Sequence, residues 1–423
     1  MSTPIPLGTG AAPAGRPDPA AAWRRRAVWH RRTALLPLGY LAAAVAVGGL
    51  AAAGFHVHWL LLHIVLLGAV SNAIVVWSAH FSAAILRAPA AERRLAEAIR
   101  LGALNVGILA VLIGGSLGPV WLGIGGAAVV FAAIAAHLAG LAAMARRALP
   151  ARFRVVVWYY LVAGVALLTG IPAGAWMLAV PANRRPRVLL FHVQVNVLGW
   201  VMLTVLGTLL TLWPTVLRTQ ITEGAARDAR RGLIACTAGL AVLAAGMVWW
   251  LRPLAAAGLA ILAAGVLVAL RPMVPEARRR RPASFAALSL AAGTLWLLIT
   301  LGWDGWALLT ASGPAAAAGR FGLLAVAMAA GFAGQVLIGA LGYLLPTALG
   351  GGPSAVRQNM ASLDRYPRWR VAAFNVGLVA LLWLPGGAVR VAGVALVSAA
   401  AAAFVIPAAV LALRARRAGA SAA

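Results

Sequence analysis

The chain has 423 residues, of which 63% are hydrophobic and only 10% are charged. Apolar runs of about twenty residues recur along it, each long enough to cross a hydrocarbon core of roughly 30 Å as a helix, which excludes a soluble globular protein. The formal net charge is +28, but all 36 basic residues are arginines placed between the apolar runs. They indicate membrane topology signals and not a nucleic-acid-binding surface.

Arginine clusters and Pro/Gly turns divide the chain into twelve expected membrane spans. They cover 33–53, 58–87, 98–116, 120–145, 154–180, 187–217, 231–251, 253–271, 283–302, 321–346, 369–387 and 390–413. We therefore predict an all-α polytopic membrane protein. Its expected parts are a disordered basic cytoplasmic arm over 1–32, one transmembrane domain over 33–413 and a cytoplasmic tail over 414–423.

The arginines also predict the orientation of the spans. With both termini in the cytoplasm, 30 arginines lie inside and 6 outside, as the positive-inside rule requires. We therefore expect a multi-pass protein of the bacterial inner membrane. No loop is long enough to form a soluble domain, so any large partner outside the lipid bilayer has to be another chain.

Internal similarity relates three of the spans. Spans six and ten match at an offset of 132, in the pairs Gly199–Gly331, Gly207–Gly339, Pro214–Pro346 and Thr215–Thr347. Span two joins them at an offset of 131, which places His63 on Gln194. Because these spans are four apart, we expect three four-helix units in a pseudo-threefold arrangement, at about 33–145, 154–271 and 283–413.

The stretches HIVLLGAVSNAIVVWSAHFSAAILR (63–87), FHVQVNVLGWVMLTVLGTLLTLWPTVLRTQ (191–220) and GFAGQVLIGALGYLLPTALGGGP (331–353) carry a family resemblance. A core of three four-helix arcs, each with its second helix inside, resembles subunit I of the haem-copper oxidases and the smaller NnrS-type membrane proteins, in an actinobacterial branch. The resemblance implies haem or copper, and electron transfer or sensing in nitrogen-oxide (nitric oxide) or copper redox metabolism. It also implies a periplasmic multicopper oxidase or cupredoxin-type partner, because members of that branch occur joined to, or beside, multicopper oxidase or copper nitrite reductase domains.

The sequence departs from the oxidase pattern in its ligands and its acids. Span ten carries no histidine and offers only Gln335 and Tyr343 as polar groups, and span seven also lacks histidine. The acids nearest to spans, Glu97 and Asp304, are expected just outside helix ends. We therefore exclude a proton-pumping terminal oxidase and leave open whether the protein is an enzyme.

Two histidines are the main candidates for metal or haem binding. Spans two and six both begin outside, so His63 and His192 should lie at matched depth near the outer face. They could be axial ligands of one haem or two ligands of one copper, or they could bond neighbouring helices. Gln194, two residues further on, should point away from His192 and bond a second-shell or interhelical partner. Trp200 could stack on a porphyrin or fill space between helices.

The other histidines of the spans predict weaker or separate sites. His56 and His58 lie at the outer turn, where they suit a surface copper chelate or are interfacial histidines without metal. His80 lies 17 residues after His63, about 25 Å along the same helix, and could belong only to a second, inner haem. His137 is expected to make an interhelical bond.

Three classes of function follow from these patterns. The first is a haem- or copper-binding redox protein. The second is a metal-free membrane anchor or assembly partner of a periplasmic copper enzyme. The third is a transporter, which the twelve spans and the repeats favour. Two points disfavour it: the repeats look threefold and parallel whereas common transporter architectures are twofold, and no charged residue is expected inside the membrane.

Overall fold

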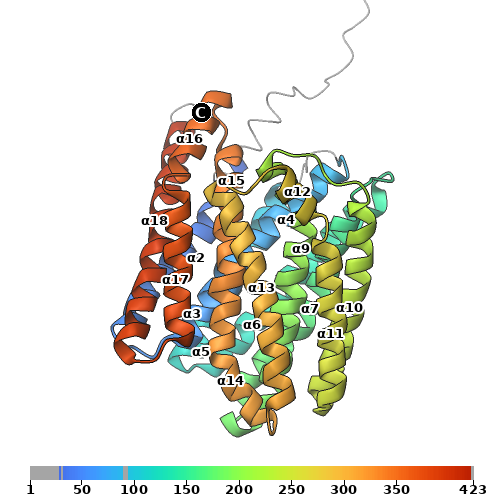
Figure 1. Ribbon diagram of the computed structural model, residues 1–423, viewed down its shortest axis with the longest axis vertical. Coiled ribbons are helices and arrows are strands. Elements are labelled where there is room, and N and C mark those ends of the chain that lie inside the picture. The colour runs from blue at the N-terminus through green and yellow to red at the C-terminus, as the bar shows by residue number, and fades with distance from the viewer. Residues whose placement is uncertain (1–27, 30–31, 89–93, 421–423) are drawn as a thin grey trace, which may run out of the picture.

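The computed structural model of the protein describes residues 28–29, 32–88 and 94–420. These residues form helices, turns and loops, with no strand among them, and eleven of the helices are long and apolar enough to cross a membrane. Figure 1 shows the long helices side by side in one bundle. The predicted multi-pass helical membrane protein is confirmed at this level of detail.

The first half of the bundle contains six of the expected spans. Its elements are α2 (Leu35–Ala52), α3 (His58–His63), the π-helix η1 (Ile64–Val70), α4 (Ser71–Ile85), α5 (Arg94–Leu117), α6 (Val120–Arg147), α7 (Val155–Ala179), the short 3₁₀ helix η2 (Ala182–Arg184), α8 (Pro186–Val193), the π-helix η3 (Gln194–Met202) and α9 (Leu203–Leu217). The helices α3, η1 and α4 run on as one span, and so do α8, η3 and α9.

The second half contains the remaining expected spans and two short helices, α12 and α16. Its elements are α10 (Ala225–Trp249), α11 (Arg252–Leu270), α12 (Met273–Arg279), α13 (Phe285–Thr310), α14 (Pro314–Val326), the π-helix η4 (Ala327–Gly334), α15 (Gln335–Leu349), α16 (Gly352–Leu363), α17 (Pro367–Trp383) and α18 (Gly387–Ala420). The expected span over 369–387 corresponds to α17, which has only 17 residues and is not among the eleven. The number twelve therefore stays a prediction.

The two predicted end segments are only partly described. The arm expected over 1–32 lies almost wholly outside the described residues. The tail expected over 414–423 is helical as far as it is described, because α18 continues to Ala420. This helix ends at the end of the bundle that also carries α12 and α16 (Figure 1).

Each of the three spans that match in sequence contains a π-helix. These are η1, η3 and η4, which precede α4, α9 and α15; Pro214 and Pro346 then lie inside α9 and α15. A π-helix has wider i→i+5 turns, is rare, and occurs frequently at functional sites. These π-helices were not predicted from the sequence. Their first residues are nevertheless separated by nearly the same offsets as the matched spans.

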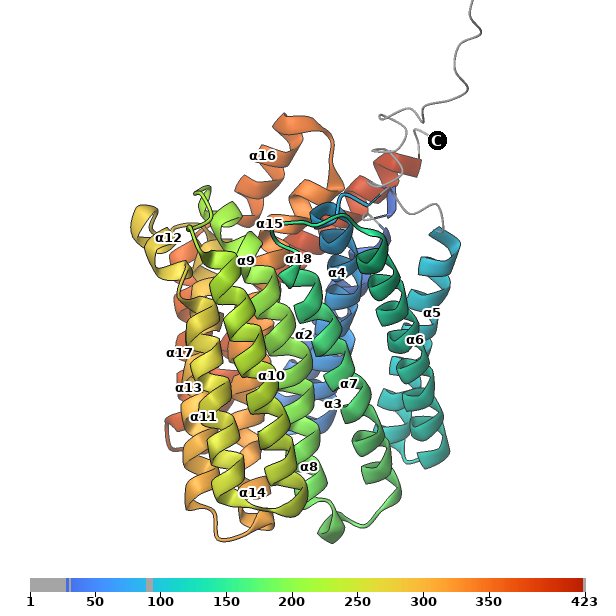
Figure 2. The same ribbon diagram turned by 90° about the vertical axis from the view of Figure 1, so that its right-hand side faces the viewer.

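The spans with π-helices form the interior of the bundle. In the span Pro186–Leu217, 83% of the apolar 18-residue stretch is buried inside the bundle, whereas in α18 the share is 17%. The segment η4 contacts both η1 and η3, and Trp200 of η3 donates a hydrogen bond to Ser71 Oγ of α4 at 3.0 Å. Hairpins such as α5–α6, at one edge in Figure 2, lie outside this interior.

Candidate functional site

His63 is the last residue of α3, directly before the π-helix η1. Its Nδ1–H donates to the carbonyl oxygen of Trp59, one turn earlier, at 2.8 Å, and its ring stacks on the Trp59 ring with centroids 4.1 Å apart. A carbonyl oxygen can only accept, so the hydrogen belongs on Nδ1 and Nε2 keeps a lone pair. The half-buried imidazole is thus oriented with Nε2 available to a ligand.

His192, on α8, is anchored in a similar way to a different helix. Its Nδ1–H donates to the carbonyl oxygen of Gly170 on α7 at 2.9 Å. The ring lies against Gly174, where a Cβ atom would come within 2.6 Å of Cε1. The absence of a side chain at Gly174 leaves the space for the imidazole, and the absence of one at Gly170 leaves space for Asn196.

Asn196 covers the ring of His192. Its Nδ2 lies 3.1 Å from Nδ1 and 3.3 Å from Nε2 of that ring. An Nδ2 atom in the plane of the ring, at nearly equal distances from both ring nitrogens, would clash with Cε1 between them. The amide therefore lies over the face of the ring and not along the lone pair of either nitrogen. Nε2 of His192 therefore also keeps a lone pair in the ring plane.

The two anchored histidines lie toward the same end of the bundle. A charge on His192 acts on His63, and so does a charge on His58. The helices α3 and α8 that carry His63 and His192 lie toward the same end in Figure 2. A site shared by the two imidazoles stays a prediction.

The donor set limits what the pair could hold. No group of three or more His, Cys, Asp or Glu side chains is placed to hold a metal ion within the described ranges 28–29, 32–88 and 94–420. Two imidazoles suit a haem, because the porphyrin supplies the remaining nitrogens, or a copper with few protein ligands. The residues present fit these two groups better than a four-ligand zinc site.

The remaining predicted metal ligands lie apart from this pair or on the surface. His56 is exposed in the turn before α3, and His58 is the exposed first residue of α3. His80 lies far along α4, where its ring contacts Trp77 and Phe81. His137 is buried and shares a hydrogen bond with Ser78 Oγ on α4 at 2.9 Å, the kind of interhelical bond that was predicted.

Trp200 and Gln194, the other predicted cofactor contacts, bond neighbouring helices. Trp200 is 2% exposed, fills space at the centre of the bundle and donates to Ser71. Gln194 is fully buried, and its Nε2 donates to Oδ2 of Asp304 on α13 at 2.7 Å. Gln194 points away from His192, as expected. The interhelical partner that the sequence predicted for it is the carboxyl group of Asp304.

The prediction that Asp304 lies just outside a helix end is wrong. The helix α13 continues from Phe285 to Thr310, and the Asp304 side chain is fully buried within it. The expected span ended at 302 because the spans were divided at arginine clusters and Pro/Gly turns. Glu97 also lies inside its helix, in the first turn of α5. The helix that corresponds to the expected span over 283–302 is therefore longer than expected, and it contains the carboxyl group of Asp304.

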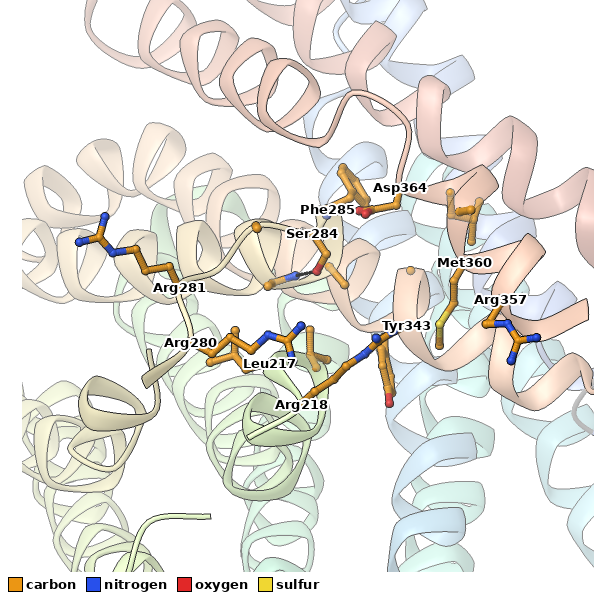
Figure 3. Close-up of a pocket in the computed structure, with 17 residues that line it drawn as sticks. Leu217, Arg218, Arg280, Arg281, Ser284, Phe285, Tyr343, Arg357, Met360 and Asp364 are labelled. Atoms are coloured by element: carbon orange, nitrogen blue, oxygen red, sulfur yellow. Dashed lines mark hydrogen bonds between the residues drawn. The ribbon is translucent and has the colours of Figure 1, made fainter. Parts of the chain in front are cut away.

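A separate pocket of about 440 Å³ lies at the opposite end of the bundle, and it involves none of the histidines. Its lining includes Arg218, Arg280, Arg281, Arg357 and Asp364. Figure 3 shows the side chains of Arg218 and Arg280 close together beside Tyr343, whereas those of Arg281 and Arg357 point away. The Asp364 carboxylate accepts from the backbone N–H of Phe285.

Comparison with known proteins leaves the family unassigned. No family model matches the chain, and no curated protein shows significant similarity to it. The resemblance to the haem-copper oxidases and NnrS-type proteins thus stays a prediction from the three quoted stretches.

Proposed function

We propose that the protein is an integral protein of the bacterial inner membrane in which His63 and His192 hold one haem or one copper near the outer face. The observation that carries this proposal is that both imidazoles lie toward the same end of the bundle and each has Nδ1 bonded to a backbone carbonyl. Histidines that ligate metals almost always donate their second ring N–H to such a partner, which fixes both tautomer and ring orientation.

The chain's own residues supply orientation and shielding at this site. The carbonyls of Trp59 and Gly170 hold the two rings, and Trp59 and Asn196 each cover one ring face. When bound, the metal would supply one-electron redox chemistry or binding of a small gas ligand such as nitric oxide. We infer a role as electron carrier or sensor in nitrogen-oxide or copper redox metabolism.

The wider features of the proposal rest on sequence and on the repeated elements. Both termini would lie in the cytoplasm, in keeping with the arginine distribution. The three π-helices at corresponding positions support a pseudo-threefold arrangement of twelve spans, the plan implied by the resemblance to the oxidases. On that resemblance, a periplasmic multicopper oxidase or cupredoxin-type protein would be the redox partner.

Cofactor content tests the proposal. Protein purified in mild detergent should contain close to one haem or one copper per chain, measured by absorption spectroscopy and by elemental analysis. His63→Ala and His192→Ala should each remove it. His137→Ala is the matched control, because His137 is buried but bonded to Ser78, and it should keep the cofactor. Well-folded wild-type protein with neither haem nor copper would contradict the proposal.

A second candidate function is transport. The repeats, which look threefold, and the expected lack of charged residues inside the spans spoke against transport. The burial of Asp304 within α13 removes the second objection, since ionisable residues inside membrane spans commonly mark ion or substrate pathways. A protein without a cofactor would make transport the leading candidate, ahead of a metal-free anchor for a periplasmic copper enzyme.

A further inference from the structure

The pair formed by Gln194 and Asp304 leaves two polar atoms without partners. Both side chains are 0% exposed, and the single hydrogen bond between them runs from Nε2 of Gln194 to Oδ2 of Asp304. Oε1 of Gln194 and Oδ1 of Asp304 have no hydrogen-bond partner in the described part of the chain. Buried polar atoms are nearly always bonded, so two orphans on two groups already in contact require an explanation.

Two other polar pairs in the same bundle show what a complete arrangement looks like. Asn105 donates to Asn72 at 2.9 Å and Asn72 donates back at 3.2 Å. Asn375 donates to Gln335 at 2.9 Å and Gln335 donates back at 3.1 Å. In both pairs, two planar groups on different helices exchange two hydrogen bonds, so each amide oxygen and nitrogen within the pair has a partner.

A single proton gives the Gln194–Asp304 pair the same pattern. An ionised carboxylate only accepts, so it cannot bond the amide oxygen, and the two orphan oxygens repel each other. When Oδ1 of Asp304 carries a proton, this O–H donates to Oε1 of Gln194 while Nε2 of Gln194 continues to donate to Oδ2. The two planar groups are then joined by two hydrogen bonds. The proton also removes the cost of a buried negative charge that has no positive partner.

The charged groups around α13 do not supply that positive partner. The charged or titratable side chains on the helices packed against it, which are α9, α11, α14, η4, α15 and α17, are Arg252, Arg320, Tyr343, Arg368 and Arg370. Arg252 donates to the carbonyl of Ala311 at 2.6 Å, and Arg320 bonds residues 307 and 310.

The other three groups and the nearest histidine also point elsewhere. Arg370 packs over the ring of Phe285, 19 residues before Asp304, and Tyr343 lines the pocket at that same end. Arg368 is in the first turn of α17, next to Arg370. His192, two residues before Gln194, bonds α7. Among the described residues, Gln194 is therefore the only side chain that hydrogen-bonds Asp304.

The pair lies near one end of the bundle. Gln194 lies eight residues after the start of α8, and Asp304 lies six residues before the end of α13. These spacings correspond to about 12 Å and 9 Å along the helix axes. Gln194 is the first residue of η3, so a change at the pair acts directly on a π-helix of the interior.

We propose that Gln194 and Asp304 form a proton-binding site inside the membrane domain. Asp304 takes up one proton from water on Oδ1, which joins the two side chains by a second hydrogen bond, and its release leaves a carboxylate with one bond. The site does not depend on the histidine pair or on any cofactor. It gives the bundle an intramembrane carboxyl group of the kind used in proton relays and proton-coupled transport.

Infrared spectroscopy of the full-length protein tests this directly. The difference spectrum between wild type and Asp304→Asn near neutral pH should contain the C=O stretching band of one protonated carboxyl group, shifted by deuterium exchange. Asp304→Asn should fold, because asparagine can make both bonds that the two amide pairs make. Gln194→Leu should move the band to higher frequency, since a carboxyl group that loses hydrogen bonds has a stiffer C=O bond.

Asp228→Asn is the matched control, because Asp228 lies 3.9 Å from Arg271 and should contribute no such band. The absence of a band assigned to Asp304 would show an ionised carboxylate and overturn the proposal. Loss of the band when choline chloride is replaced by sodium chloride would identify a sodium site and overturn it as well.

Discussion

Span six carries three polar residues at alternate positions, His192, Gln194 and Asn196. The two sides of the helix on which they lie differ in chemistry. His192 and Asn196 face α7 and are half-buried, and the imidazole is held by a backbone carbonyl with one nitrogen left over. Gln194 faces α13, is fully buried and meets an acid. Residues two apart on a helix are separated by about 200° around its axis, so one short segment serves two sites. One side suits a metal and the other a proton.

Filling the space that seats His192 should have the largest effect on the first side. In Gly174→Leu, the new side chain occupies the position of the imidazole, whose Cε1 lies 2.6 Å from the Cβ position. The ring then loses its bond to Gly170, and we expect cofactor content to fall by roughly ten- to a hundred-fold, as for lost supporting contacts at metal ligands. Metal and haem analysis measures this.

Gly125→Leu is the control for that substitution, because nothing lies within 4 Å of its Cβ position. It should retain the wild-type cofactor content. Full cofactor binding in Gly174→Leu would show that the His192 ring is not a ligand in the observed position. The infrared band of Asp304 should be the same in both variants, because the two sides of span six are separate.

Removing Gln194 should produce a smaller effect, on stability and on the infrared band of Asp304 but not on the cofactor. Gln194→Leu leaves the buried carboxyl group of Asp304 without a partner, so we expect a loss of about 1–3 kcal/mol in the free energy of unfolding in detergent. Cofactor content should not change. Gln358→Leu makes the same substitution at an exposed position and should stay within about 0.5 kcal/mol of wild type. Loss of cofactor in Gln194→Leu would mean that the two sides are coupled.

Hydropathy and the internal repeat predicted the features of the fold that depend on periodic composition. Each expected span coincides with a helix, because runs of about twenty apolar residues have few other stable states in a membrane. The placement of His63 and His192 toward one end of the bundle followed from the expectation that spans two and six both begin outside. Whether the two side chains share a site stays a prediction.

The hydrogen-bond partners of the polar side chains could not be predicted from the sequence. Asp304 was placed outside its helix because the spans were divided at arginine clusters and Pro/Gly turns, which ended this one at 302. The helix in fact continues to Thr310, just before Ser312-Gly313-Pro314. The apolar residues after Asp304 were the available signal for a longer helix. Nothing in the sequence pairs Gln194 with a residue 110 positions away, and the π-helices depend on packing between spans.

The most direct test of the histidine site is chemical rescue. His63→Gly and His192→Gly each remove one imidazole and leave space for a free one. We predict that both variants lose the haem or copper of the wild-type protein, and that added imidazole restores cofactor content and the wild-type absorption spectrum. Retention of the cofactor in either variant without imidazole would contradict the account, because the removed side chain could not then have been a ligand.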